Sequence, residues 1–287
     1  MIATFKHELS MHFKGLTAYM VSVLILFITG MNVLDLMEAR SLAFDVVIIN
    51  ASVIFLIVVP VLTMRVLAEE RRQKTDQLLY SLPITMTDVV LGKYLAMMVV
   101  FLIPVLIICF YPLVLSSYGA VNLKLSYSAI LLFFLLGAAL VSIGTFVSAM
   151  TESQMASAGV CFMVILLNNL LPGFISRIPG SAVISMAICV VLALLLGVAV
   201  WKLTKNSTFG LAVDTVLIAG ILGVFLLKAE LFENLFAKLL KKISFYQLFY
   251  DIHYGALDLG TVVYFLSIVG FFLFLTVQTL EKRRWSE

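Results

Sequence analysis

Long apolar blocks separated by short polar segments dominate the sequence. An apolar block of about 20 residues matches a helix that crosses the roughly 30 Å hydrocarbon core of a bilayer. On this pattern we predict eight membrane-spanning helices: Thr17 to Leu36, Phe44 to Met64, Tyr94 to Ser116, Tyr127 to Met150, Met155 to Ile175, Ser181 to Trp201, Thr208 to Lys228 and Gly260 to Leu280. The predicted fold class is therefore all-α, a polytopic transmembrane helical bundle that forms a single domain over residues 1–287.

The sixth and seventh predicted spans leave an alternative open. Only Trp201 to Ser207 separates them, and the charged Asp214 falls inside the seventh, so six spans plus a re-entrant hairpin also fit. Both versions have an even number of spans, which puts both termini on one side. With eight spans, twelve Lys and Arg residues fall on the side of the termini and seven on the other. Because basic residues favour the cytoplasmic loops, both termini are predicted to be cytoplasmic and the chain to lie in the plasma membrane.

Composition and charge agree with a lipid environment. Hydrophobic residues make up 63% of the chain and charged residues 12%, far from the balance of a soluble domain. The net charge is only +3, and the basic residues lie in short loops rather than on one continuous face, so no nucleic-acid partner is expected. The cysteines Cys109, Cys161 and Cys189 each lie in an apolar block, which predicts neither disulfides nor a metal site. No cofactor is expected.

Residues 1–16 carry an amphipathic pattern ahead of the first span. Phe5, Leu9, Phe13 and Leu16 recur every three or four residues, so they share one face of a helix. Such a helix is expected to lie in the cytoplasmic interface, with its basic residues near lipid headgroups. The alternative is a disordered leader.

Residues 65–93 form the longest charged stretch between predicted spans. The i,i+4 pair Glu70 and Lys74 favours a helix at its start, and Pro83 ends that helix. Thr87 or Asp88 would then cap a second helix leading into the third span. A helix followed by an apolar patch and a proline turn predicts a docking element, while a solvated loop is the alternative.

Residues 229–259 contain a second amphipathic pattern. Between Glu230 and Tyr250 one helical face is apolar and the opposite face carries Lys238, Lys241 and Lys242. We predict an interfacial helix on the outer side of the membrane. It would either guard a substrate path or serve as a packing helix.

Two stretches resemble a known family. The first carries these residues of a recurring signature in order: Arg65, Glu69, Glu70, Arg71, Thr75, Leu78, Leu79, Ser81, Pro83, Gly92 and Lys93. It is similar to the segment between the second and third spans of type-2 ABC transporter permeases, the bacterial exporter and gliding-motility group. The second stretch, Phe245 to Trp285 with FYQLFYDIHYGALDLGTVVYFLS, resembles the gliding-motility branch. The predicted hairpin from Ser181 to Lys228 departs from the six spans usual in that group.

The resemblance implies a permease subunit of an ATP-binding cassette (ABC) transporter that dimerises, with itself or a related chain, and exports a substrate. ATP would be hydrolysed by a separate ATPase subunit. In the family, the segment that corresponds to residues 65–93 sits in a cleft of that ATPase. Carried over by motif, the ATPase-docking residues are expected to be Glu69, Arg72, Leu78, Leu79 and Pro83.

Other activities have little support in the sequence. There is no G-x-x-x-x-G-K-[ST] phosphate loop and no H-E-x-x-H motif, so the chain is predicted not to be an enzyme. Asp214 is the clearest ionisable residue inside a predicted span and is therefore a candidate functional residue. It keeps a second hypothesis open, an ion-coupled secondary transporter. A third hypothesis is a membrane anchor or assembly factor that transports nothing.

Overall fold

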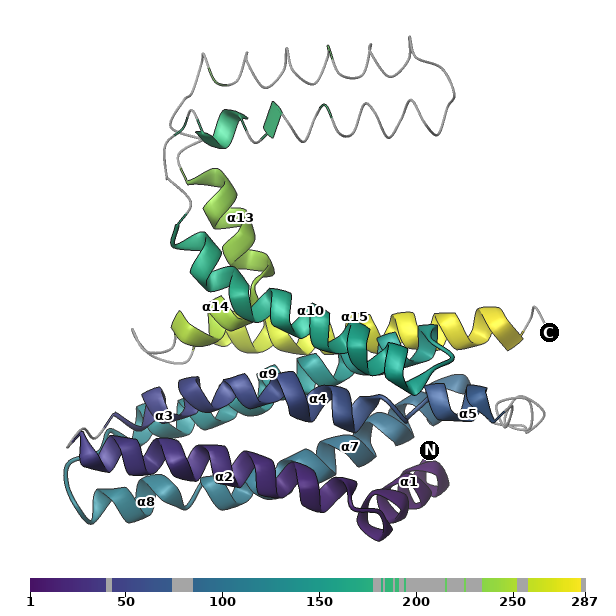
Figure 1. The fold of residues 1–287 in the computed structure, drawn as a ribbon, viewed down its shortest axis with the longest axis horizontal. Coiled ribbons are helices and arrows are strands. Elements are labelled where there is room, and N and C mark those ends of the chain that lie inside the picture. The colour runs from purple at the N-terminus through teal and green to yellow at the C-terminus, as the bar shows by residue number, and fades with distance from the viewer. Residues whose placement is uncertain are drawn as a thin grey trace. The chain divides into compact units, whose positions relative to one another are not determined.

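The computed structural model describes residues 1–39, 43–73, 85–177, 234–251 and 258–284, with residues 182, 184–187, 189, 190, 194, 215 and 225 (Figure 1). Throughout this described part the regular structure is helical, which confirms the predicted all-α fold class. The helices are α1 (Ile2–Lys14), α2 (Thr17–Glu38), α3 (Phe44–Ala51), η1 (Ser52–Ile54), α4 (Phe55–Thr63), α5 (Ala68–Arg72), α7 (Met86–Ile108), α8 (Tyr111–Ser116), α9 (Leu123–Met150), α10 (Gln154–Ile175), α13 (Leu235–Ile243), α14 (Phe245–Tyr250) and α15 (Leu259–Arg284).

Six stretches of the described chain are long and apolar enough to cross a membrane. They are Thr17–Glu38, Phe44–Arg72, Met86–Ser116, Leu123–Met150, Gln154–Ile175 and Leu259–Arg284. Each contains one of the predicted spans, in the predicted order. The predicted spans from 181 to 201 and from 208 to 228 lie outside the described residues except for single positions, so the choice between eight spans and six stays a prediction.

Prolines interrupt the apolar helices, as is tolerated where neighbouring helices satisfy the freed carbonyls. Pro104 lies inside α7 and Pro60 inside α4. Pro112 stands in the first turn of α8, where the missing amide hydrogen would have no partner within the helix anyway. The third span therefore consists of two helices, α7 and α8, rather than one.

The chain divides into two compact units, residues 1–169 with 248–287, and residues 170–247. In the first unit α2, α4, α7 and α9 lie side by side (Figure 1). The aromatic rings of Phe55, Phe101 and Phe133 meet at its centre, with centroids 4.6 to 6.0 Å apart. They join α4, α7 and α9. Gly137 makes room for this cluster, because a Cβ there would lie 2.5 Å from the ring of Phe101.

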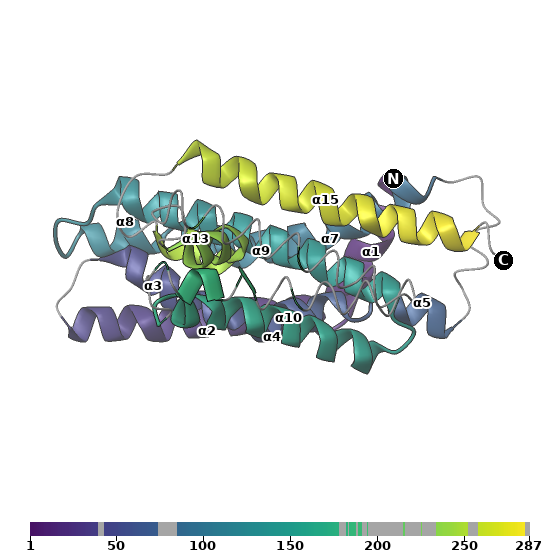
Figure 2. The same ribbon diagram turned by 90° about the horizontal axis from the view of Figure 1, so that it is seen from above.

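Helix α9 is the central helix of this unit. It contacts α3, α4, α7 and α15, and α15 runs along it (Figure 2). Against α4 the contact is close, since a Cβ on Gly144 would lie 2.5 Å from the hydroxyl oxygen of Thr63. Phe146 of α9 and Phe272 of α15 pack with ring centroids 5.8 Å apart. A movement of α9 would therefore displace the helices that pack against it in this unit.

The described part of residues 229–259 before the last span, residues 234–251, forms two helices rather than one. Helix α13 ends at Ile243, and α14 begins at Phe245, because Ser244 adopts an extended backbone with φ −81° and ψ 108°. The Ser244 hydroxyl accepts a hydrogen bond from the Gln247 amide at 3.1 Å and so caps α14. The prediction of one uninterrupted helix from Glu230 to Tyr250 is thus wrong at Ser244. Two residues of the predicted apolar face, Leu239 and Ile243, are exposed on α13.

Candidate functional site

Helix α1 packs against the first turns of α7. The approach is close at Gly92, where a Cβ would lie 3.0 Å from the Thr4 Cβ and 3.1 Å from the Met1 carbonyl oxygen. The helix predicted over residues 5 to 16 is confirmed, although it ends at Lys14 and leaves Leu16 exposed. The side of α1 that carries Thr4 faces α7, and the position of this helix in the cytoplasmic interface stays a prediction.

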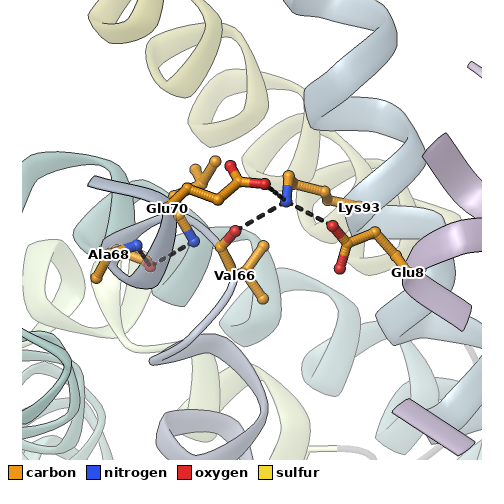
Figure 3. Close-up of polar contacts among 7 residues, drawn as sticks. Glu8, Val66, Ala68, Glu70 and Lys93 are labelled. Carbon is orange, nitrogen blue, oxygen red and sulfur yellow. Dashed lines mark hydrogen bonds and ion pairs between the residues drawn. The ribbon is translucent and has the colours of Figure 1, made fainter. Parts of the chain in front are cut away.

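A buried lysine of α7 joins three segments of the chain. The Lys93 ammonium donates to the Glu8 carboxylate of α1 at 2.6 Å and to the Glu70 carboxylate of α5 at 2.7 Å (Figure 3). Its third hydrogen bond goes to the Val66 carbonyl oxygen at 3.0 Å. The Lys93 side chain is 3% exposed, against 14% for Glu8 and 29% for Glu70. All three donors of the ammonium are used, so the cluster is complete on the lysine side. We call Glu8, Glu70 and Lys93 the lysine cluster.

Helix α5 is held from a second side by α9. The buried Ser148 hydroxyl accepts hydrogen bonds from the Leu67 amide at 3.2 Å and from the Ala68 amide at 3.1 Å. These amides stand at the start of α5, where no helical carbonyl is available to them. A side chain from a distant helix therefore supplies the cap that the local sequence lacks.

A third contact ties α5 to the ends of α9 and α15. The Arg71 guanidinium lies 2.6 Å from the Glu152 carboxylate and also donates to the Met150 carbonyl oxygen at 3.3 Å. The same carbonyl oxygen accepts a hydrogen bond from Arg283 of α15 at 3.5 Å. Displacement of α5 would consequently pull on α1, α7, α9 and α15 together.

The predicted docking residues lie partly within this site. Glu69 and Arg72 are on α5; Glu69 accepts a hydrogen bond from Gln73 at 3.1 Å, and Arg72 is exposed. Leu78, Leu79 and Pro83 lie outside the described residues, as does Asp214. The structure thus places two of the five predicted docking residues beside the lysine cluster.

The sequence did not reveal the lysine cluster itself. Glu70 lies 2.7 Å from Lys93, a contact that the sequence did not predict. The expected pair of Glu70 with Lys74 stays a prediction, because Lys74 lies outside the described residues. The amphipathic pattern of the first helix did not indicate a partner for Glu8. The available signal was Lys93 itself, a lysine in the second turn of the long apolar helix α7. A charge in such a place requires a partner.

Among the residues that the structure describes, no group of histidine, cysteine, aspartate and glutamate side chains could hold a metal ion. The site consists of ion pairs and hydrogen bonds that join helices. Such an arrangement can transmit a displacement.

The sequence model of the family described as "ABC-2 family transporter protein" matches residues 3–182. The chain belongs to this family. The match begins in α1 and runs through α5, α7, α9 and α10, so it includes every residue of the lysine cluster. No curated protein and no solved structure matches the chain significantly.

Membership of the ABC-2 family fixes the general role of the chain. It is a multi-pass membrane protein, the permease component of an ABC transporter, and it is not itself the catalytic subunit. The family implies an ABC ATPase as partner. It confirms the resemblance that residues 65–93 carry to type-2 ABC permeases.

Proposed function

We propose that this permease, a single transmembrane domain over residues 1–287, exports a substrate across the plasma membrane. Each chain would dimerise with itself or a related chain and bind one ATPase subunit, and both termini would be cytoplasmic. ATP-driven closure of the ATPases would then push on residues 65–93. The resemblance of this segment to the ATPase-binding segment of type-2 permeases motivates the proposal.

The observation that carries this proposal is the anchoring of α5. To transmit a force from the ATPase, α5 must be joined to the membrane spans. It is joined to α1 and α7 by Lys93, to α9 by Ser148, and to α15 through the Met150 carbonyl. Hydrogen bonds to buried charged groups hold such elements in a fixed geometry. A push on α5 would therefore tilt the spans to which it is joined and open a path between two permease chains.

Co-purification tests the docking role. The tagged protein is purified in mild detergent, and partners are identified by mass spectrometry, beside the double variant Glu69→Lys, Leu79→Asp. We expect a phosphate-loop ATPase with the wild-type protein and its loss from this variant. The matched control is Leu123→Asp, Lys124→Glu at the start of α9, far along the chain from α5, which should retain the ATPase. If the ATPase were recovered equally with both variants, residues 65–93 would not be the docking segment.

Transport assays separate this proposal from the ion-coupled alternative. Asp214 is the candidate intramembrane residue for that mechanism. Transport that needs no ATP, runs on a proton gradient and is abolished by Asp214→Asn would overturn the proposal of ATP-driven export. Transport that stops when ATP is withheld would support it.

A further inference from the structure

A cavity of about 610 Å³ lies directly beside the lysine cluster. One wall is α1 with the first residue of α2, the other wall is the end of α4 with α5, and Lys93 of α7 also lines it. All these elements belong to the same compact unit. The cavity is large enough for a small polar group with part of its apolar attachment.

The cavity offers one cation and one anion that the protein does not pair with each other. Lys93 is occupied by Glu8 and Glu70, as described above. Arg65 and Glu69 line the same cavity, and in the described part of the chain neither takes part in an ion pair. Arg65 is exposed, and the Glu69 carboxylate accepts a hydrogen bond from the neutral amide of Gln73. A ligand that carries both charges would therefore find a partner for each.

The apolar part of the lining is also continuous with the membrane spans. Met11, Val61 and Leu62 line the cavity beside the charged residues. Thr17, the first residue of α2, lies at its edge, and Arg65 follows the last turn of α4. Arginine at the end of a span sits at the level of the lipid headgroups, with its apolar neighbours at the level of the first acyl carbons.

From this arrangement we propose that the cavity binds the zwitterionic headgroup of a phospholipid with a primary ammonium, that is, a phosphoethanolamine lipid. Its phosphate binds Arg65, whose planar guanidinium matches two phosphate oxygens. Its ammonium donates hydrogen bonds to Glu69, and its glycerol end lies against Val61 and Met11. An anionic lipid such as phosphatidylglycerol would satisfy Arg65, but it has no ammonium to offset the repulsion between its phosphate and the lining carboxylates. A trimethylammonium headgroup has no hydrogen to donate to Glu69.

Lipid binding by the purified chain tests this assignment without the ATPase, so its outcome is independent of the proposed docking function. Short-chain phosphatidylethanolamine, phosphatidylcholine and phosphatidylglycerol are titrated into the delipidated protein in detergent, with binding followed by native mass spectrometry. We expect phosphatidylethanolamine to bind about tenfold more tightly than phosphatidylcholine, since a hydrogen bond to a charged group contributes roughly that factor.

Two variants separate the two ends of the headgroup. Glu69→Gln should bring phosphatidylethanolamine down to the affinity of phosphatidylcholine. Arg65→Gln should weaken both lipids about tenfold, because it removes the contact to the shared phosphate. The matched controls are Lys14→Gln and Asp35→Asn, exposed charges that do not line the cavity, and both should bind all three lipids as the wild type does.

Several results would overturn the proposal. If the wild-type protein bound phosphatidylethanolamine and phosphatidylcholine with equal affinity, Glu69 would not accept hydrogen bonds from the lipid ammonium. If Lys14→Gln weakened lipid binding as much as Arg65→Gln, the effect of Arg65 would come from general surface charge and not from a contact in the cavity. Tighter binding of phosphatidylglycerol, or displacement of bound lipid by inorganic phosphate at equal concentration, would replace the zwitterionic headgroup by a simple anion.

Discussion

The Lys93 ammonium lies 2.6 Å from a carboxylate oxygen of Glu8, a contact that joins α7 to the first helix of the chain across 85 residues. With Glu70 on its other side, Lys93 is the point at which α1, α5 and α7 meet. Removing an ammonium from water costs free energy, and its carboxylate partners offset that cost. Such a cluster fixes geometry more than it adds stability, which suits an element that must transmit a displacement.

Replacing Lys93 by methionine should destabilise the protein strongly. The change keeps an unbranched side chain that lacks only the terminal ammonium, and it leaves Glu8 and Glu70 as neighbouring carboxylates without their cation. Breaking a buried ion pair from one side costs roughly 3 kcal/mol. We expect a loss of this order in the free energy of unfolding, measured by SDS-induced unfolding in mixed micelles.

The triple variant Lys93→Met, Glu8→Gln, Glu70→Gln is the control for that experiment. It removes all three charges, so the repulsion and the uncompensated burial disappear together. It should recover most of the stability, while transport driven by the ATPase should stay impaired because α5 is no longer joined to α1. Full transport in a stable triple variant would show that the lysine cluster does not couple the helices.

Gly92→Ala tests the packing of α1 on α7. Its Cβ would come within 3.1 Å of both the Thr4 side chain and the Met1 backbone, so α1 would have to shift. Overpacking of this kind costs about 1 to 3 kcal/mol, only partly offset by the better helix propensity of alanine. We expect faster hydrogen exchange of the α1 amides. In Gly30→Ala the added Cβ meets nothing within 4 Å, and α1 should exchange as in the wild type.

Much of the transmembrane architecture was predictable because few backbone conformations are stable in lipid. A backbone within the bilayer must satisfy its hydrogen bonds internally, so a long apolar block becomes a helix. Each of the six spans found in the described chain contains a predicted one. The cap of the helix that leads into the third span was predicted at Thr87 or Asp88, whereas α7 begins at Met86 and has Thr85 as its N-cap. Lys93 lies in this helix, and its distant partners Glu8 and Glu70 compensate its burial.

The candidate site was less predictable because periodicity identifies the faces of a helix but not what covers them. The helical pattern of α1 was correct, but it did not show that Glu8 would contact Lys93 of α7. The cap of α5 could not be predicted from the local sequence either, since Ser148 lies 80 residues from Ala68. Contacts between such distant positions depend on how the helices pack, and that information is not contained in the local sequence.

Ser148→Ala should loosen α5. The hydroxyl accepts from two buried amides, and its removal leaves both without a partner. A buried unsatisfied amide costs about 1 to 3 kcal/mol. We expect a loss of that order in the free energy of unfolding, together with faster exchange of the Leu67 and Ala68 amides.

Ser142→Ala on the same helix is the matched control for Ser148. Its hydroxyl is equally buried, but it donates to the Ala139 carbonyl within its own helix. Its removal leaves no amide without a partner, so the effect should be clearly smaller than that of Ser148→Ala. If Ser142→Ala and Ser148→Ala cost the same, the hydroxyl of Ser148 is not acting as the cap of α5.

Acidification should weaken the α1 region through His12. Burial lowers the pKa of this imidazole from the ordinary value of 6.5, with the nearby Glu8 carboxylate opposing the shift and the Lys93 ammonium adding to it. Because the pKa is lower in the folded protein, the unfolded chain takes up the proton more readily as the pH falls below about 6.5. The stabilising effect of a neutral His12 is present above that pH and is lost as the pH falls toward the lowered pKa.

We therefore expect the thermal unfolding temperature in detergent to fall between pH 7.5 and pH 5.5, and to fall less in His12→Gln. Glutamine keeps a polar side chain of similar length but takes up no proton in this range. The matched control is His7→Gln, on an exposed position of the same helix, which should retain the dependence of the wild type. An unchanged dependence in His12→Gln would assign the acid sensitivity to other groups and leave His12 without a role in it.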